Sequence, residues 1–316
     1  MTNRKTDDKI MKVLIATQKP FAKAAVDSIK EVIATAGFEP VMLEKYAGAD
    51  DLKKAVADAD AVIIRSDIID ADVLAAAPKL KIVVRAGAGY DNVDLATAKA
   101  QGVVVQNTPG QNSNAVAELV FGMTVMAIRN MYDGTSGSEL RGKTIGIQAF
   151  GQVGRNVARI AKGFDMTVSA LDPYCPAEDI AAAGVTPVQT VNDLYSNNQF
   201  VSIHIPATAE TRGSIGYDLI RLMPQGGVLI NTARKEVIDE AGLAKALEER
   251  PDLKYVADVK PDNADELKER FGNRVFFTPK KMGAQTAEAN INAGIAAAEQ
   301  VVAYLRDGIN RFQVNK

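Results

Sequence analysis

The sequence predicts an α/β protein with two domains, each built on a parallel sheet, and three observations support this prediction. Short runs rich in β-branched residues alternate with alanine-rich stretches of helical periodicity along most of the chain. The short runs are apolar on both faces, which is typical of strands in a parallel sheet that helices cover on two sides. The chain has 316 residues, of which 47% are hydrophobic and 24% are charged, and this is enough for two packed cores.

The runs form two series along the chain. The first series predicts strands at residues 12–16, 61–64, 81–84 and 103–106. After a long helical stretch at residues 112–131, the second series predicts strands at residues 144–149, 167–171, 200–203, 228–230, 255–258 and 275–277. Residues 286–305 have apolar positions at helical spacing and predict a long helix that returns to the first domain. Ligands of such folds bind beyond the carboxyl ends of the strands, so we expect the active site in the cleft between the two sheets.

Charge and cysteine content argue against several classes of partner. Lys and Arg number 37 against 39 for Asp and Glu, and the net charge of -2 gives no field to hold a nucleic acid or an anionic membrane surface. Apolar stretches such as residues 115–128 are shorter than a bilayer span. Cys175 is the single cysteine, so we expect no disulfide, no metal site and a cytoplasmic location.

The polar residues 1–10 precede a second methionine, Met11, and are expected to be a disordered leader.

A glycine turn between a predicted strand and a predicted helix indicates a nucleotide site. Gly151 lets the backbone approach a pyrophosphate at the positive end of the helix, and Gly154 lets that helix lie close to the sheet. Ala149 replaces the first glycine of the usual G-x-G-x-x-G pattern. Asp172, eighteen residues after Gly154, is placed to accept hydrogen bonds from an adenosine ribose and to repel a 2′-phosphate. The turn therefore favours NAD over NADP, with a packing turn and an ordinary Asp-Pro turn as the alternatives.

Further segments fit one family in its order along the chain. They are residues 65–66, 85–94, 107–109, 116–119, the glycine turn, 204–211, 231–234 and 283–286. With these segments the chain resembles the D-isomer-specific 2-hydroxyacid dehydrogenases over nearly its whole length after Met11.

The resemblance implies two Rossmann-like, doubly wound domains. A substrate-binding domain comprises residues 11–109 and 287–316, and an NAD-binding domain, residues 110–286, also forms a homodimer. The residues expected to bind NAD are Phe150, Gly151, Gln152, Val153, Gly154, Asp172, His204, Pro206, Thr211, Thr232, Ala233, Asp258 and Gly283.

The implied chemistry is hydride transfer between nicotinamide and the carbon that bears the 2-hydroxyl. A guanidinium must hold the substrate carboxylate and the carbonyl oxygen, and Arg234 fits this role. The family's acid/base is a histidine shortly before Gly-Ala-x-Thr, where this chain has Lys280 and Lys281. Counting back from Gly283 favours Lys281, and counting forward from Pro279 favours Lys280.

The glutamate that partners the family's histidine is replaced by Asn263, with Asp262, Asp265 and Glu266 nearby. A carboxylate would push the pKa of an amine further above the working range. The loss of the family's histidine to a lysine is therefore consistent with the loss of the partner glutamate. We hypothesise that an ammonium donates the proton in the reducing direction and the amine accepts it in the oxidising direction. The alternative is that both lysines are a solvated basic pair and catalysis is lost.

Two other residues have competing interpretations. His204 is the only imidazole and therefore a rival acid/base, although the resemblance places it beside the nucleotide. Asp258 is expected by resemblance to bind the nicotinamide amide, and its alternative role is a helix cap.

A phosphorylated substrate needs cations or backbone amides beyond Arg234. Arg65 with Ser66 follows a predicted strand, and the turn Gly87-Ala88-Gly89 offers backbone donors to the substrate carboxylate; Arg85 and residues 112–114 are weaker candidates. The short, lysine-bearing form resembles a subgroup that oxidises D-3-phosphoglycerate to 3-phosphohydroxypyruvate in serine synthesis. A glyoxylate or hydroxypyruvate reductase, and a non-catalytic NAD-sensing protein of corepressor type, remain as alternatives.

Overall fold

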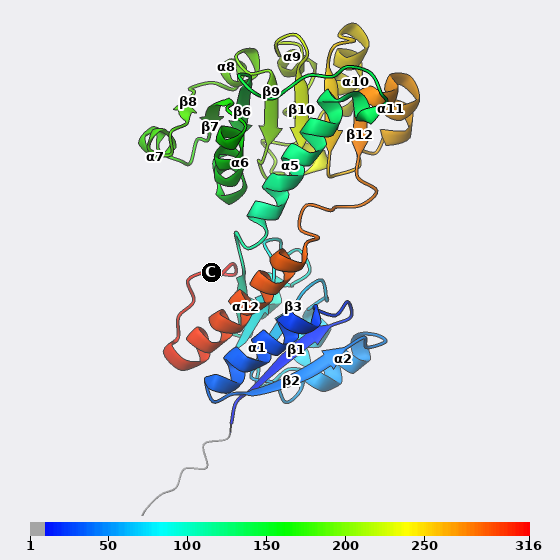
Figure 1. Ribbon diagram of the computed structural model, residues 1–316. Helices are drawn as coiled ribbons and strands as arrows, with labels where there is room; N and C mark the ends of the chain where they lie inside the picture. Colours follow the sequence, from blue (N-terminus) through cyan, green and yellow to red (C-terminus); the bar gives the residue numbers. More distant parts are fainter. Residues whose placement is uncertain (1–9) are drawn as a thin grey trace, which may run out of the picture. The chain divides into compact units, whose positions relative to one another are not determined.

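A computed structural model describes residues 10–316 of the chain, which form two compact units (Figure 1). Unit 1 contains the described residues up to Asn112 together with Thr286–Lys316, and unit 2 is Ser113–Gln285. Of the expected leader, only the exposed Ile10 belongs to the described residues. The borders expected from the sequence fall after residues 109 and 286.

Unit 1 is a five-stranded parallel sheet with the strand order β2-β1-β3-β4-β5. The strands are β1 (Lys12–Thr17), β2 (Glu39–Glu44), β3 (Ala61–Ile64), β4 (Ile82–Arg85) and β5 (Val104–Asn107). The helices are α1 (Lys23–Thr35), α2 (Ala49–Val56), α3 (Ala71–Ala75), α4 (Leu95–Ala100) and α12 (Ala287–Asp307).

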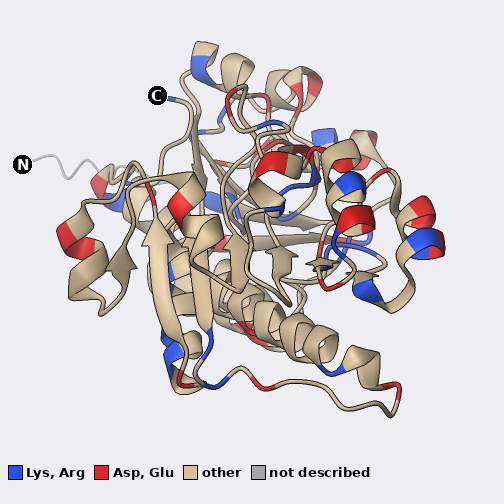
Figure 2. Cartoon of the chain, turned by 90° about the horizontal axis from the view of Figure 1, so that it is seen from above, with Lys and Arg blue, Asp and Glu red and all other residues tan. Residues whose placement is uncertain are grey.

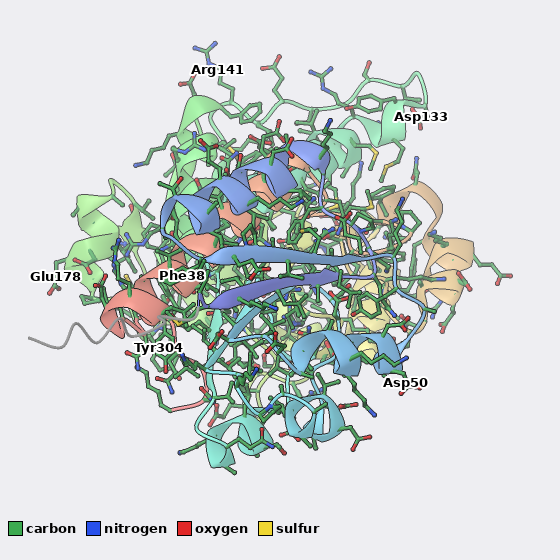
Figure 3. All side chains as sticks on the ribbon, turned by 90° about the horizontal axis from the view of Figure 1, so that it is seen from below. Phe38, Asp50, Asp133, Arg141, Glu178 and Tyr304 are labelled. Carbon is green, nitrogen blue, oxygen red and sulfur yellow. The ribbon has the colours of Figure 1, made fainter. Side chains whose placement is uncertain are left out.

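Helices cover both faces of this sheet, as the two-sided apolar runs predict. Val13 and Ile15 of β1 pack with α1 and α12, whereas Leu14 and Ala16 pack with α2, α3 and α4. Phe38 and Tyr304 lie at the margin of the cluster on the α1 and α12 side (Figure 3). Successive side chains of a strand point to opposite faces, so alternate residues build the two cores.

The edges of the unit 1 sheet differ from the sequence-based expectation. The structure adds β2, which was not predicted, because this edge strand contains no fully buried residue and includes Pro40. On the other edge, the C-terminal segment pairs antiparallel with β5 through a bridge between Gln106 and Gln313. The buried Asn315 amide continues this pairing, because Oδ1 accepts from Val105 N (3.0 Å) and Nδ2 donates to Val103 O (2.8 Å).

Unit 2 is a seven-stranded parallel sheet with the order β12-β11-β10-β9-β6-β7-β8. The strands are β6 (Thr144–Gln148), β7 (Thr167–Leu171), β8 (Thr186–Pro187), β9 (Phe200–Ile203), β10 (Val228–Asn231), β11 (Lys254–Ala257) and β12 (Val275–Phe277). The helices are α5 (Ser113–Ile128), α6 (Gln152–Gly163), α7 (Ala177–Ala182), α8 (Val191–Ser196), α9 (Tyr217–Ile220), α10 (Glu240–Glu249) and α11 (Ala264–Phe271), with 3-10 turns η1 (Asn130–Tyr132), η2 (Lys235–Val237) and η3 (Gly272–Arg274).

The strand order of unit 2 determines where its ligand edge lies. Side chains of α5, α6 and α7 build one core, and side chains of α8 to α11 build the other. From β6 the chain adds β7 and β8 on one side and then returns to add β9 on the other. The carboxyl ends of β6 and β9 flank this switch point, which is where open α/β sheets bind ligands. The prediction of two parallel α/β domains is therefore confirmed.

Acidic and basic residues are interspersed on the helices (Figure 2), in agreement with the small net charge. Within the described residues, no helix is both long and apolar enough to cross a membrane.

We expect Asn315→Ala to destabilise the chain by about 1–3 kcal/mol, because it leaves the buried Val105 N–H and Val103 C=O without partners. Urea unfolding measures the loss, and hydrogen exchange should show faster exchange at the Val105 amide. Asn310→Ala is the matched control, since the Asn310 amide bonds only to Gln313 on the surface. Equal effects of the two variants would contradict the assigned role of Asn315.

Candidate active site

The glycine turn of unit 2 joins β6 to α6 in a strained conformation. Ala149 has φ +79°, a left-handed conformation that glycine adopts without strain. A Cβ at Gly154 would lie 2.3 Å from Ala149 O, so α6 can approach the strand only with glycine at this position. Gly151 is the N-cap of α6, and the first-turn amides, including those of Gln152 and Val153, have no acceptor within the helix. The turn thus presents N–H groups suited to an anion.

Asp172 follows β7 and holds the glycine turn. Its Oδ2 accepts from Phe150 N at 2.7 Å, and its Oδ1 accepts from Tyr174 N at 2.8 Å. Phe150 is buried, and the Arg155 guanidinium lies 4.8 Å from its ring centroid. The structure therefore brings Asp172 to the turn, as the sequence predicts, and leaves it lone pairs for a ribose hydroxyl.

His204 lies at the carboxyl end of β9, beside the switch point. Its backbone N–H donates to Gln148 O (2.9 Å), and its Nε2 contacts Ser202 Oγ at 2.9 Å. Burial lowers the pKa of His204 to about 3, which is far from the range of an effective acid/base near neutral pH. The Thr211 hydroxyl closes the following loop by donating to Pro206 O at 2.6 Å.

The loop after β10 is organised by the buried side chain of Asn231. Its Oδ1 accepts from Ala233 N and its Nδ2 donates to Arg234 O, both at 2.9 Å. The Thr232 hydroxyl is also buried and has no hydrogen-bond partner among the described residues. An unpaired buried hydroxyl is costly, so this atom is a candidate contact for a bound ligand.

Asp258, at the end of β11, holds the loop that carries the two lysines. Its fully buried carboxylate accepts from Thr278 Oγ1 (2.9 Å), Met282 N (2.6 Å) and Gly283 N (2.8 Å). A Cβ at Gly283 would lie 2.9 Å from Asp258 Oδ2, so the loop approaches the carboxylate closely. The helix-cap alternative for Asp258 is wrong, because α11 begins at Ala264 with Asn263 as its N-cap. The expected contact of Asp258 with nicotinamide stays a prediction.

Arg234 and Lys281 meet at one backbone oxygen. Arg234 Nη1 donates to Ala233 O at 2.9 Å, and Lys281 Nζ donates to the same oxygen at 3.4 Å. Both side chains are exposed to solvent at this edge of the sheet. Lys280 is also exposed, and its amine has no hydrogen bond or ion pair within residues 10–316. The geometry therefore favours Lys281 over Lys280 as the partner of Arg234.

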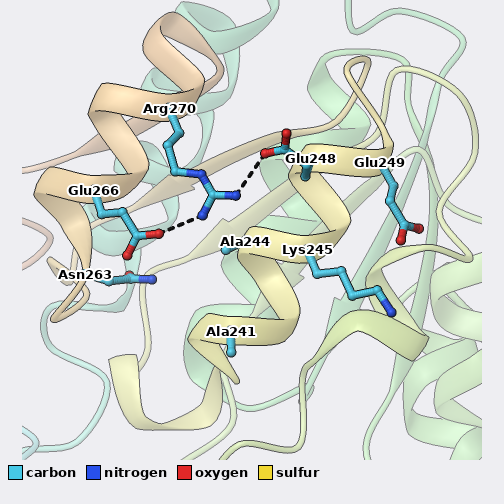
Figure 4. Close-up of a pocket in the computed structure, with 8 residues that line it drawn as sticks. All are labelled: Ala241, Ala244, Lys245, Glu248, Glu249, Asn263, Glu266 and Arg270. Carbon is cyan, nitrogen blue, oxygen red and sulfur yellow. Dashed lines mark hydrogen bonds and ion pairs between the residues drawn. The ribbon is translucent and has the colours of Figure 1, made fainter.

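The acids nearest in sequence to the position of the missing family glutamate each form an ion pair. Asp262 pairs with Lys235, Asp265 pairs with Lys260, and Glu266 pairs with Arg270. The Asn263 side chain lines a groove between α10 and α11, where Arg270 lies between Glu266 and Glu248 (Figure 4). The acids nearest in sequence are thus engaged by other cations.

In unit 1, Arg65 follows β3 and is largely occupied by its own unit. Its Nη1 donates to Lys19 O and Pro20 O, each at 3.1 Å, and its Nη2 donates to Asn290 Oδ1 at 2.5 Å. Five N–H groups are available on a guanidinium, so two remain for a ligand. Ser66 is exposed, and its hydroxyl makes no hydrogen bond to the described residues.

Arg85, a weaker candidate in the sequence, lies against the glycine turn of unit 1. A Cβ at Gly87 would fall 1.5 Å from Arg85 Nη1, and Gly87 has φ +147°, a conformation that side-chain-bearing residues rarely adopt. Arg85 Nε is buried and has no partner among the described residues. Burial lowers the pKa of Arg85, and the nearby Arg65 guanidinium lowers it further. Two arginines thus lie close together, with Ala88 and Gly89 on the same turn.

No group of three or more His, Cys, Asp or Glu side chains in residues 10–316 is arranged to hold a metal ion.

Comparison with known proteins agrees with this geometry. Residues 115–279, more than half of the chain, match the family described as D-isomer specific 2-hydroxyacid dehydrogenase, NAD binding domain.

The chain belongs to this family.

Its relatives in the 2-hydroxyacid dehydrogenase family include two curated proteins with different names. D-3-phosphoglycerate dehydrogenase of Methanocaldococcus jannaschii is 34% identical over 96% of this chain and 59% of its own length. Hydroxypyruvate reductase of Thermotoga maritima is 35% identical over 80% of this chain and 87% of its own length. The chain therefore spans only part of the phosphoglycerate dehydrogenase relative.

Among solved structures of the family, NAD+-bound 3-phosphoglycerate dehydrogenase of Entamoeba histolytica is similar over 97% of this chain and 99% of that one. The TM-score is 0.84 and the sequence identity is 46%. The family prediction and the prediction of an NAD-binding domain are confirmed. The roles of single residues stay predictions.

Because Ala149 is held at positive φ, we expect Ala149→Gly to stabilise the chain by about 0.5–1 kcal/mol. The increase in the free energy of unfolding is smaller than the strain energy at position 149, since glycine also increases the entropy of the unfolded chain. Urea unfolding in the absence of NAD measures it. Ala158→Gly, inside α6, is the control and should destabilise. A lower stability for Ala149→Gly would contradict the assigned strain.

Proposed function

We propose that this chain is an NAD-dependent dehydrogenase that oxidises D-3-phosphoglycerate to 3-phosphohydroxypyruvate. The observation that carries the proposal is the meeting of Arg234 and Lys281 at Ala233 O, at the carboxyl edge of an NAD-binding domain. The names of the M. jannaschii and E. histolytica relatives support the choice of substrate. A place in serine synthesis follows from this reaction.

The residues of unit 2 fit NAD. The first-turn amides of α6 suit its pyrophosphate, and Asp172 suits the ribose hydroxyls. The loops containing Pro206, Thr211, Ala233 and Gly283 border the same edge, where the unpaired Thr232 hydroxyl offers one polar contact. When bound, NAD accepts the hydride from the substrate carbon.

Arg234 holds the reacting end of the substrate in this proposal. A planar guanidinium forms paired hydrogen bonds with a carboxylate, and it stabilises negative charge on the neighbouring oxygen. The Asn231 side chain binds Ala233 N and Arg234 O, and these two hydrogen bonds fix the backbone from which the Arg234 side chain extends. Its present bond to Ala233 O is a neutral contact that a carboxylate can replace.

Lys281 supplies and removes the hydroxyl proton. As an ammonium it donates a proton to the carbonyl oxygen in the reducing direction, and as an amine it accepts the hydroxyl proton in the oxidising direction. A neighbouring guanidinium disfavours a second positive charge, which favours the neutral amine needed for oxidation.

Arg65 and Arg85 of unit 1 are proposed to bind the phosphate. Two adjacent guanidinium groups repel each other, and a dianionic phosphate removes this repulsion while accepting several charge-assisted hydrogen bonds. Ala88 and Gly89 add backbone N–H groups on the same turn. Ser66 is proposed as a further polar contact.

A hydroxypyruvate reductase is the second candidate, because the T. maritima relative carries that name. It would use the same Arg234 and Lys281 and would not need a phosphate site. A non-catalytic NAD sensor is the third candidate. It would need neither Lys281 nor an arginine at position 234 to hold a substrate.

We further propose a cytoplasmic homodimer formed through unit 2. In α5, Leu119, Gly122 and Met126 follow one another at helical spacing and stay partly exposed. A partly exposed apolar stripe of this kind suits a second copy of the chain.

Replacement of Lys281 tests the mechanism. We expect Lys281→Ala to lower kcat at least a hundredfold, the usual size of general acid/base catalysis, and Lys280→Ala to lower it less than threefold. Initial rates with NADH and 3-phosphohydroxypyruvate measure both, and NAD affinity should stay within twofold in each variant. Full turnover in both variants would refute the lysine mechanism.

The substrate is tested with phosphorylated and unphosphorylated hydroxypyruvate, each with NADH and NADPH. We expect kcat/KM to favour the phosphorylated compound at least a hundredfold, and Arg85→Met to reduce this preference at least tenfold, as loss of a charge-assisted hydrogen bond implies. Arg311→Met, on the surface of unit 1, should leave it unchanged. A wild-type preference for unphosphorylated hydroxypyruvate would support the reductase instead.

A further inference from the structure

A buried carboxylate joins three loops of unit 1 at the carboxyl edge of its sheet. Asp67 is 3% exposed. Its Oδ1 accepts from Gln18 N (2.7 Å) in the loop after β1 and from the Tyr46 hydroxyl (2.6 Å) in the loop after β2. Its Oδ2 accepts from Arg65 N (3.2 Å) in its own loop. Three donors satisfy a charge that would otherwise be costly to bury.

Arg65 and Asp67 hold the same short segment from two sides. Asp67 binds the N–H of Gln18, whereas the Arg65 guanidinium binds the carbonyl groups of Lys19 and Pro20. The position of the guanidinium therefore depends on the position of this segment. Asp67 fixes both the segment and the backbone of Arg65, so it acts on the guanidinium through two routes.

Tyr46 reaches Asp67 from a strained turn. The preceding residue, Lys45, has φ +54°, and its N–H donates to Thr17 O at 3.2 Å. A left-handed conformation costs a non-glycine residue about 1–2 kcal/mol, and it persists only where its surroundings enforce it. Burial raises the pKa of Tyr46, and the hydrogen bond to Asp67 raises it further, so the phenol remains a donor.

Asn92 holds the Arg65 loop from the remaining side. Its Nδ2 donates to Asp67 O at 2.6 Å, and its own carbonyl accepts from Ile69 N at 2.9 Å. The loop is therefore fixed through its side chains and through its backbone.

We propose that Asp67 and Tyr46 are positioning residues for the anion-binding arginine Arg65. They do not touch the substrate; they hold Arg65 and the segment that it grips in the geometry that captures the phosphate. The proposal rests on the proposed function, because it assigns Arg65 to substrate binding. It predicts an effect on substrate affinity and none on the chemistry in unit 2.

Tyr46→Phe is the test, since it removes one hydrogen bond and keeps the ring. We expect KM for D-3-phosphoglycerate to rise three- to tenfold, with kcat and KM for NAD within twofold of the wild type. Tyr217→Phe is the matched control: it removes an equally short bond, 2.6 Å from the Tyr217 hydroxyl to Glu249 Oε2, on the surface of unit 2. This control should leave all three constants unchanged.

A second measurement separates this proposal from the proposed function. Titration with inorganic phosphate, followed by NMR at the Ala88 and Gly89 amides, should show affinity at least threefold weaker in Tyr46→Phe than in the wild type. Wild-type protein that binds phosphate but turns over no 2-hydroxy acid would refute the proposed function alone. Three results would overturn the positioning role. They are an unchanged phosphate affinity in Tyr46→Phe, a wild-type protein that does not bind phosphate, and a Tyr46→Phe variant in which kcat falls and the KM values for D-3-phosphoglycerate and NAD both rise by similar factors.

Discussion

The carboxylate of Asp258 determines where a lysine can act in unit 2. It binds two consecutive backbone N–H groups and one hydroxyl of the loop after β12, and no other described residue holds that loop so closely. Since Met282 and Gly283 are fixed, the preceding Lys281 is directed to Ala233 O, where Arg234 already donates. A buried acid thus sets the position of the loop that carries an exposed lysine. The same arrangement recurs in unit 1, where the buried Asp67 fixes the backbone of the partly exposed Arg65.

The exchange of the family's histidine and glutamate for Lys281 and Asn263 becomes intelligible on electrostatic grounds. A carboxylate beside an imidazole raises its pKa toward neutrality, whereas beside an amine it would stabilise the ammonium and remove the base. In this chain Asn263 caps α11 and faces a groove between two helices, and Asp262 is neutralised by Lys235.

Much of the fold was predictable from the sequence, because buried strands carry a strong apolar signal. The expected strands at residues 61–64, 167–171, 200–203 and 275–277 coincide with β3, β7, β9 and β12. The edge strand β2 was missed because its residues are only partly buried, so no continuous apolar run marks it. For the site, family motifs indicated Arg234, Lys281 and Asp172, and Arg85 was a weaker candidate. The approach of Arg85 to Arg65 and the contacts of Asp67 with Gln18 and Tyr46 join residues distant in sequence, which a single chain without its coordinates does not reveal.

Several unfavourable local features lie at the carboxyl edges of the two sheets. Ala149 adopts a conformation suited to glycine, the Thr232 hydroxyl is buried without a partner, and Arg85 Nε is buried beside a second guanidinium. A left-handed alanine and a buried polar atom without a partner each lower the stability of the free protein. On the proposed function, a bound dinucleotide or phosphate would supply partners for Thr232 and Arg85, so binding would recover part of the free energy that these unpaired groups cost the free protein.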